Sequence, residues 1–299
     1  MSRSLAVALT TTETALLSSP SGTNSWGSSG QCRRQALPVT RGLFSVLQEA
    51  LSRGDKRRVR LNQHVYDTAA DFQHLLHSLA SHPTRLQELV PTPPLAIGAS
   101  DACQRGMGGV WFDAQSHSAS TVWRQPFAPQ ISADMVSDRN PHGSLSISDL
   151  ELTAYKDVLA HDRDVRERTV WIASDNQAAV SWSTKGSSTS LAARAYLLRY
   201  NALHQRCHRY FSRHHYIPGP VKAMADDASR CWDLRGEDLL THFDHMYPQT
   251  LSWQLRHLPS ETNASLTGAL CRKRPSSSAL LDNEALRPTP VGTCGPVSV

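Results

Sequence analysis

The pattern of apolar and polar residues divides the chain into segments of different character. Residues 1–35 are rich in Ser, Thr and Gly and show no sustained period, which indicates a disordered leader. Over residues 36–92 the apolar residues recur at spacings of three and four, as in LFSVLQEAL and FQHLLHSLA, and predict a small helical segment. This segment ends at VPTPPL, because proline lacks a backbone donor and disfavours helix at the residue before it.

Residues 94–233 alternate short apolar runs with helical periods. Three successive runs predict an antiparallel meander: LAIGAS, MGGVWFD and STVWRQPF. The remaining pattern predicts a helix, a buried strand, two helices, a strand and a helix: SDLELTAYKDVLAH, TVWIAS, NQAAVSW, SLAARAYLLRYNALHQRC, RYFSRHHYIPG and VKAMADDASRCW. A meander followed by parallel strands predicts an α/β fold with a mixed five-stranded sheet and helices on both faces.

Residues 234–299 are expected to hold one more helix, within LLTHFDHMYPQTLSWQLRHL, and then a Pro- and Ser-rich tail. The whole chain has 299 residues, and an α/β domain of ~150 residues already buries enough apolar surface to fold alone. The abrupt start and the tail lead us to expect a fragment of a longer polyprotein.

Charge and cysteine content restrict the partner and the compartment. Lys and Arg exceed Asp and Glu by 31 to 26, which mildly favours a polyanionic partner. The 6 cysteines are scattered, with no Cys-x-x-Cys pair and no Cys/His cluster at zinc spacing, so we expect free thiols in the cytoplasm or nucleus. No run of 18 apolar residues occurs and the N-terminal apolar run is interrupted by polar residues, so neither secretion nor a membrane partner is expected.

Four carboxylates stand where a strand is predicted to end or a helix to begin: Asp101, Glu151, Asp175 and Asp226. Two divalent metals that hydrolyse a phosphodiester need such hard oxygen ligands from several carboxylates. The ions lie ~3.5–4 Å apart, so one carboxylate must bridge them. Asp101 is the best bridging candidate, because it ends the first strand near the middle of the predicted sheet.

Each carboxylate except Asp101 also has an ordinary structural explanation. Glu151 fits a capping box with Ser148, and Asp226 could interact only with the helix dipole. Asp175-Asn176 could be an ordinary strand-to-helix cap. Asp101 is harder to explain in this way, because a carboxylate after a buried apolar run is costly to desolvate without a nearby cation. The four together favour a metal site.

The series GASDACQRGMGGVWF, SDLELTAY, WIASDNQAAVSW and YIPGPVKAMADDASR resembles the ribonuclease H domain of retroelement reverse transcriptases, and most of all that of DIRS-type retrotransposons. The resemblance covers Pro94 to Trp232, and residues 36–92 resemble the connection segment before that domain. It implies that Asp101, Glu151, Asp175 and Asp226 bind two Mg²⁺, with Mn²⁺ as a possible substitute. The implied reaction is cleavage of RNA within an RNA–DNA hybrid.

The chain departs from this family at identifiable positions. It has no Tyr-x-Asp-Asp motif, so polymerase activity is not encoded here and the polymerase part of the same element is an expected partner. Lys222 replaces the Asn that the family often carries four residues before its last Asp, and the loop from Pro218 to Ala225 has no histidine. The family spacing to Ser229 favours Asp226 over Asp227 as the fourth ligand.

Several further side chains are candidates for contact with nucleic acid: Lys185, Ser187, Arg194, Lys222 and Arg230. A larger basic ridge along one predicted helix and the strand after it is also possible: Arg194, Arg199, Arg206, Arg209 and Arg213. The alternative is a solvated helix face and a polar loop. Some tryptophans could stack on bases, but their strand and helix positions are more typical of a core: Trp111, Trp171 and Trp182. Four histidines show no metal spacing and are interpreted as structural: His142, His161, His214 and His215.

These observations predict a Mg²⁺-dependent endonuclease that cleaves the RNA strand of RNA–DNA hybrids. A proofreading exonuclease of the same superfold is disfavoured, because such enzymes typically carry Asp-x-Glu on the first strand and this chain has Asp101-Ala102-Cys103. The alternative from another class is a non-catalytic nucleic-acid-binding relic of a retroelement polyprotein.

Overall fold

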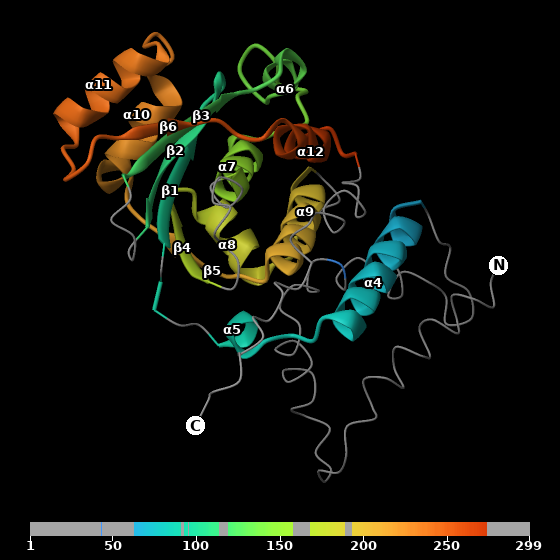
Figure 1. Cartoon of the computed structure of the whole chain (residues 1–299). Helices are drawn as coiled ribbons and strands as arrows, with labels where there is room; N and C mark the ends of the chain where they lie inside the picture. The colour runs from blue at the N-terminus through green and yellow to red at the C-terminus, as the bar shows by residue number, and fades with distance from the viewer. Residues whose placement is uncertain are drawn as a thin grey trace, which may run out of the picture.

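A mixed sheet of six strands forms the centre of the protein (Figure 1). The computed structural model describes residues 43, 63–90, 93–94, 96–113, 119–157, 168–188 and 193–273. The strands lie in the order β5-β4-β1-β2-β3-β6. Their bounds are β1 Ala96–Ala102, β2 Gly106–Asp113, β3 Thr121–Pro126, β4 Thr169–Ser174, β5 Phe211–Tyr216 and β6 Gln254–Arg256. The predicted meander is confirmed, since β1, β2 and β3 pair antiparallel, while β4 and β5 add in parallel beside β1.

Helices cover both faces of the sheet. One face carries α7 (Ile147–Asp157), α8 (Gln177–Lys185), α9 (Ala193–His208) and α12 (Ser260–Leu270). The other carries α10 (Ala223–Arg230), preceded by the 3-10 turn Gly219–Lys222, and α11 (Gly236–Met246). A short helix, α6 (Pro129–Ala133), follows β3. The fold is therefore α/β, as the alternation of apolar runs and helical periods predicted.

The two faces of the sheet have separate apolar cores. The first, under α7, α8, α9 and α12, contains Trp123, Leu150 and Ile172. The second, under α10 and α11, contains Val110 and Phe243. Six successive residues of β2 are buried, so its sequence is a continuous apolar and glycine-rich run instead of an alternating one.

The sixth strand corrects the expectation of five. β6 pairs in parallel with β3, and α12 packs on α9 and α7, although both lie in the segment expected to be a helix and a tail. β6 has only 3 residues, too few for a visible two-residue period. The sequence PSETNAS looks like a linker, but Pro259 stands at the N-cap of α12, where a missing backbone donor costs little.

The expected helical segment is present in part, as α4 (Gln63–Ser81) and α5 (Leu86–Leu89). Figure 1 shows α4 beside α9, and a buried ion pair between Asp71 and Arg199 joins the two helices. The expected leader, residues 1–35, and most of residues 36–62 lie outside the described residues.

The cysteines among the described residues, Cys103, Cys207, Cys231 and Cys271, are all free thiols. This agrees with the expectation from their scattered positions. Among the described helices, none combines the length and the apolar character that a membrane crossing requires.

Candidate active site

Two of the predicted site residues come from neighbouring parallel strands. Ala99 of β1 lies opposite Ala173 of β4. Asp101 and Asp175 each come two residues later, so they lie at the same level along the strand direction. Asp101 belongs to β1 itself, where it pairs with Gly108 and is 1% exposed. Asp175 follows the last residue of β4 and is half-buried.

The other two carboxylates come from helices on opposite faces of the sheet. Asp226 lies in the first turn of α10, and one carboxylate oxygen each from Asp101, Asp175 and Asp226 lie within 4.8 Å of one another. Glu151 extends from α7 and is 5% exposed. All four predicted carboxylates therefore meet at the end of the sheet where β1 and β4 finish.

The capping explanation is wrong for Glu151, while the strand-to-helix cap expected at Asp175-Asn176 is present but is made by Asn176 alone. The capping interaction of α7 is made by Ser146 and Asp149: the Ser146 amide donates to Asp149 Oδ2 at 2.9 Å, and the Asp149 amide donates to Ser146 Oγ at 3.3 Å. Asn176 caps α8, because its side chain accepts a hydrogen bond from the Ala179 amide at 3.0 Å. Neither Glu151 nor Asp175 is needed for a helix terminus.

Lys222 occupies the centre of the carboxylates. Its Nζ donates to Asp101 Oδ1 at 2.6 Å and to Asp175 Oδ1 at 2.5 Å. The same atom lies 3.6 Å from Asp226 Oδ1 and 3.9 Å from Glu151 Oε1, and the side chain is fully buried. The expectation that Lys222 faces nucleic acid is therefore wrong, because the 3-10 turn before α10 directs this side chain inward.

Two further residues of α10 contact Asp101. Ser229, which the sequence did not single out as a site residue, donates its hydroxyl proton to Asp101 Oδ2. Arg230 places Nε 3.5 Å from the same oxygen and a terminal nitrogen 3.8 Å from Asp226 Oδ2, with 62% of its side chain exposed. The signal for Ser229 was its position three residues after Asp226, since such residues share a helix face.

Burial is the largest influence on the pKa values of the carboxyl groups in the cluster. Burial raises the pKa of Glu151 to about 9, with the nearby Asp101 adding to the effect and Lys222 opposing it. Burial, and then the charge of Asp101, also raise the pKa of Asp226. Burial alone would raise the pKa of Asp101, but hydrogen bonds from Lys222 and Ser229 outweigh it and hold this pKa below its usual value. With Ser229, Lys222 therefore outweighs the effect of burial at Asp101 but not at Glu151 or Asp226.

The donor set fits a hard divalent cation. Carboxylate oxygens are the ligands that Mg²⁺ and Mn²⁺ prefer. Two of the buried oxygens, Glu151 Oε2 and Asp226 Oδ1, have no hydrogen-bond partner among the described residues, so both are available as ligands. Lys222 Nζ stands between Asp101 and Asp175, where a shared cation would bind. A divalent cation and this ammonium would compete for the same oxygens.

The remaining candidates for nucleic-acid contact lie apart from this centre. Lys185 is exposed at the end of α8, and Ser187 follows Gly186, whose φ of 63° terminates the helix. Arg194 stacks over the ring of Trp182 at 4.4 Å and lies 3.9 Å from Asp149. Arg194 therefore joins α7, α8 and α9 and has an intramolecular role.

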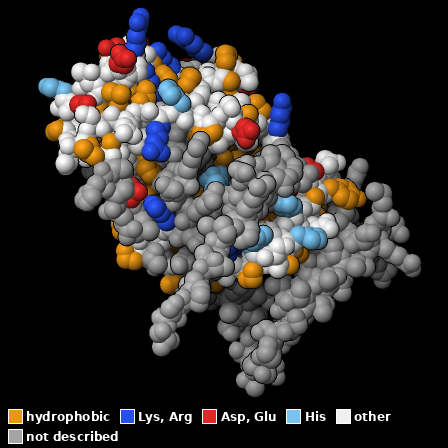
Figure 2. All heavy atoms as spheres, viewed as in Figure 1, with side chains coloured by type: hydrophobic (Ala, Val, Ile, Leu, Met, Phe, Trp, Pro, Cys, Tyr) orange, Lys and Arg blue, Asp and Glu red, His pale blue; other side chains and the backbone are white. Residues whose placement is uncertain are grey.

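The expected basic ridge is wrong, because α4 and α5 cover that face of α9. Arg199 is buried against Asp71, and Arg206 lies 3.0 Å from Glu88. Arg209 also pairs with Glu88, at 3.2 Å, whereas Arg213 in β5 is exposed. On the face shown in Figure 2, Lys and Arg side chains stand in several separate places and not in one continuous patch.

The aromatic and histidine side chains mainly pack inside the fold. Trp111 is buried in the core, as its strand position predicted, and Trp171 packs against His215 with ring centroids 4.8 Å apart. His214 forms a hydrogen bond with Ser212 at 3.2 Å. His161 lies outside the described residues.

Comparison with models of protein families, with curated proteins and with solved structures gives no match for this chain. The functional interpretation therefore depends on the geometry of the site and on the motifs of the sequence.

Proposed function

We propose that this protein is a Mg²⁺-dependent ribonuclease H that cleaves the RNA strand of RNA–DNA hybrids during replication of a retroelement. The observation that supports the proposal is the convergence of Asp101, Glu151, Asp175 and Asp226 from a central strand, a neighbouring strand end and helices on both faces. Carboxylates that are removed from water are costly to bring together without cations. Asp101 and Glu151 are buried and Asp175 and Asp226 are half-buried, so this arrangement favours binding of cations.

Bound Mg²⁺ would supply an activated water and stabilise the leaving oxygen. The residues of the chain hold and orient the reacting groups. Asp101 is the most buried of the three clustered aspartates and the most central, which suits it to a bridging position. Arg230 is exposed at the rim beside Asp101 and Asp226, so its guanidinium can contact a backbone phosphate of the RNA strand.

Specificity for the hybrid would come from shape and from the 2′-hydroxyls of the RNA strand, which a protein can contact in the wide minor groove. Base identity has no role in this proposal. Mn²⁺ would substitute for Mg²⁺, because it accepts the same oxygen ligands.

A second candidate function is nucleic-acid binding without catalysis, as in a relic of a retroelement polyprotein. Lys222 favours it, because its ammonium already forms hydrogen bonds with Asp101 and Asp175 and holds them together without a metal. Under this alternative the acidic group would be an internal salt-bridge network.

Cleavage of a labelled RNA–DNA hybrid in Mg²⁺ distinguishes the two functions. We expect the wild type to cleave, and Asp101→Asn and Asp175→Asn to fall to background while they still bind the hybrid. The matched control is Asp233→Asn, since this aspartate has 92% of its side chain exposed and pairs only weakly with Arg105 at 3.4 Å. Equal activity in all variants would rule out the acidic site, and tight binding by an inactive wild type would favour the relic.

A further inference from the structure

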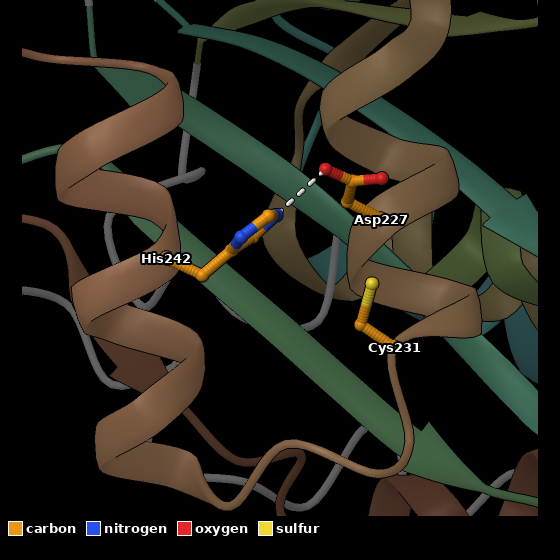
Figure 3. Close-up of side chains that lie close together, drawn as sticks. All are labelled: Asp227, Cys231 and His242. Atoms are coloured by element: carbon orange, nitrogen blue, oxygen red, sulfur yellow. Dashed lines mark hydrogen bonds and ion pairs between the residues drawn. The ribbon is translucent and has the colours of Figure 1, made fainter.

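A second cluster of possible metal ligands lies between α10 and α11, on the side of α10 away from the acidic site. Asp227 lies on α10, and Cys231 is the C-cap residue of that helix, four residues later, where its amide donates to the Asp227 carbonyl at 3.0 Å. His242 extends from α11 toward them, and Figure 3 shows the three side chains turned toward the gap between the two helices. One ligand atom from each residue lies within 4.8 Å of the other two.

The packing around this cluster holds its two helices in place. On α11, Leu239 and Phe243 are fully buried in the core shared with Ala228 of α10. His242 is adjacent to Phe243, with which it makes a ring contact at 6.1 Å between centroids. Because α10 and α11 pack against each other, the three ligand side chains are held close together before any ion binds. Binding of an ion would therefore cost little conformational entropy.

The existing hydrogen bonds are compatible with a bound ion. Asp227 Oδ2 accepts from His242 Nε2 and from the Tyr247 hydroxyl, both at 2.9 Å. An ion bound by Asp227 Oδ2 and His242 Nε2 would replace the first of these bonds, with the ring proton of neutral His242 moved from Nε2 to Nδ1. The Tyr247 hydroxyl would remain a donor to the carboxylate and so orient the ligand from outside.

We propose that Asp227, Cys231 and His242 form a binding site for Zn²⁺ or a similar borderline divalent cation. A thiolate, an imidazole and a carboxylate are ligands typical of zinc, whereas Mg²⁺ prefers oxygen alone. The thiolate and the carboxylate balance the charge of the ion, and the thiol proton is released on binding.

The number of protein ligands and the solvent exposure of their side chains indicate a site with an open coordination position. Three protein ligands leave one coordination position for water or another ligand. The side chains of Asp227 and His242 are each 31% exposed, so this position can be reached from solvent. The ion would join α11 to α10, the helix that also carries Asp226, and this inference does not depend on the proposed nuclease activity.

Titration of the reduced full-length protein with Co²⁺, followed by absorption spectroscopy, tests the site. We expect a thiolate-to-cobalt charge-transfer band that saturates at one equivalent and is displaced by Zn²⁺. Cys231→Ser should abolish the band, and His242→Gln should weaken Co²⁺ binding at least ~10-fold. Cys271→Ser is the matched control, because this thiol is exposed and free, and it should leave the band unchanged.

Asp101→Asn should also leave the band unchanged, which separates this site from the acidic cluster. Circular dichroism of each variant verifies its fold. If the wild type gives no charge-transfer band, or if the band survives in Cys231→Ser, the proposal is wrong. The three residues and Tyr247 would then be a hydrogen-bonded link between α10 and α11 only.

Discussion

At the scale of single residues, Lys222 dominates the electrostatics of the acidic site. It is fully buried and contacts carboxylates from β1, α7, the end of β4 and α10. Attraction of Asp101 and Glu151 for the ammonium outweighs the effect of burial and raises the pKa of Lys222. Lys222 therefore stays charged at neutral pH and stabilises the arrangement that a divalent cation would otherwise stabilise.

Lys222→Met should have opposite effects on stability and on metal binding. Without metal, the variant leaves buried carboxylates without their cation, and we expect a loss of about 3–5 kcal/mol in the free energy of unfolding. Mn²⁺ should bind more tightly, because the competing ammonium is gone. Chemical unfolding in EDTA and calorimetric titration with Mn²⁺ measure the two effects. Lys185→Met, an exposed lysine, is the control, and unchanged or weaker Mn²⁺ binding by Lys222→Met would contradict competition.

Glu151 should make the stability of the metal-free protein depend on pH. Its pKa of about 9 in the folded state exceeds the ordinary value of 4.5, so the folded protein binds more protons between these values. The contribution of Glu151 to stability is then fully present below pH 4.5 and is lost as pH rises toward about 9.

Relative to Glu151→Gln, the wild type should therefore lose stability with rising pH, by at most about 1.4 kcal/mol per pH unit. Urea unfolding in EDTA at several pH values measures this difference. Glu237→Gln, which changes an exposed glutamate, should follow the wild type. A pH-independent difference between Glu151→Gln and the wild type would show that the pKa of Glu151 is the same in the folded and unfolded states, and would contradict the raised value.

At the scale of elements, the close approach of α10 to β2 decides where the carboxylates of the acidic site lie. A Cβ atom added at Gly108 would lie 2.6 Å from the backbone carbon of Ala228, so only glycine permits this contact. Gly108 is also the partner of Asp101 across the β1–β2 ladder. The close packing of α10 on β2 at Gly108 therefore places Ser229 and Asp226 of α10 beside Asp101 of β1.

Gly108→Ala should displace α10 and cost about 1–3 kcal/mol in the free energy of unfolding, as overpacking does. It should also weaken Mn²⁺ binding, because Asp226 moves with α10. The matched control is Gly268→Ala in α12, where an added Cβ would meet only the Lys273 side chain at 3.8 Å. That variant should be neutral or slightly stabilising, since alanine is the better helix former. Equal stability of the two variants would contradict the role assigned to Gly108.

At the scale of the whole molecule, the last elements complete the fold. α12 places Leu266, Ala269 and Leu270 in the same core cluster as Trp123 and Ile172. β6 extends the sheet beyond β3. The described residues after 233 therefore pack on the sheet, with α12 in its main core, and should unfold together with the sheet.

Leu266→Ala should lower the free energy of unfolding by about 2–5 kcal/mol, because it leaves a cavity in this core. Leu251→Ala, at a position that is 48% exposed, is the control and should change stability little. Chemical denaturation followed by tryptophan fluorescence measures both variants. If Leu266→Ala were as stable as the control, α12 would not contribute to the common core.

The sequence by itself determined most of the elements between residues 94 and 233, and their order. Apolar periods are local, so the meander β1–β3, the buried strand β4 and the helix α10 were readable from short windows. The positions of Asp101, Glu151, Asp175 and Asp226 at or near element ends were local features as well, and the order of the strands then placed them together. No tertiary information was needed for these predictions.

Only the tertiary structure decided which side chains face one another. Arg199 and Asp71 are 128 residues apart, and no local pattern showed that α4 would cover this face of α9. Three other features were also decided by contacts that no local pattern shows. Lys222 points into the acidic cluster, Asp227 pairs with His242, and β6 joins the sheet beside β3. Each depends on contacts between distant segments, and such contacts form only when burial of apolar surface brings those segments together.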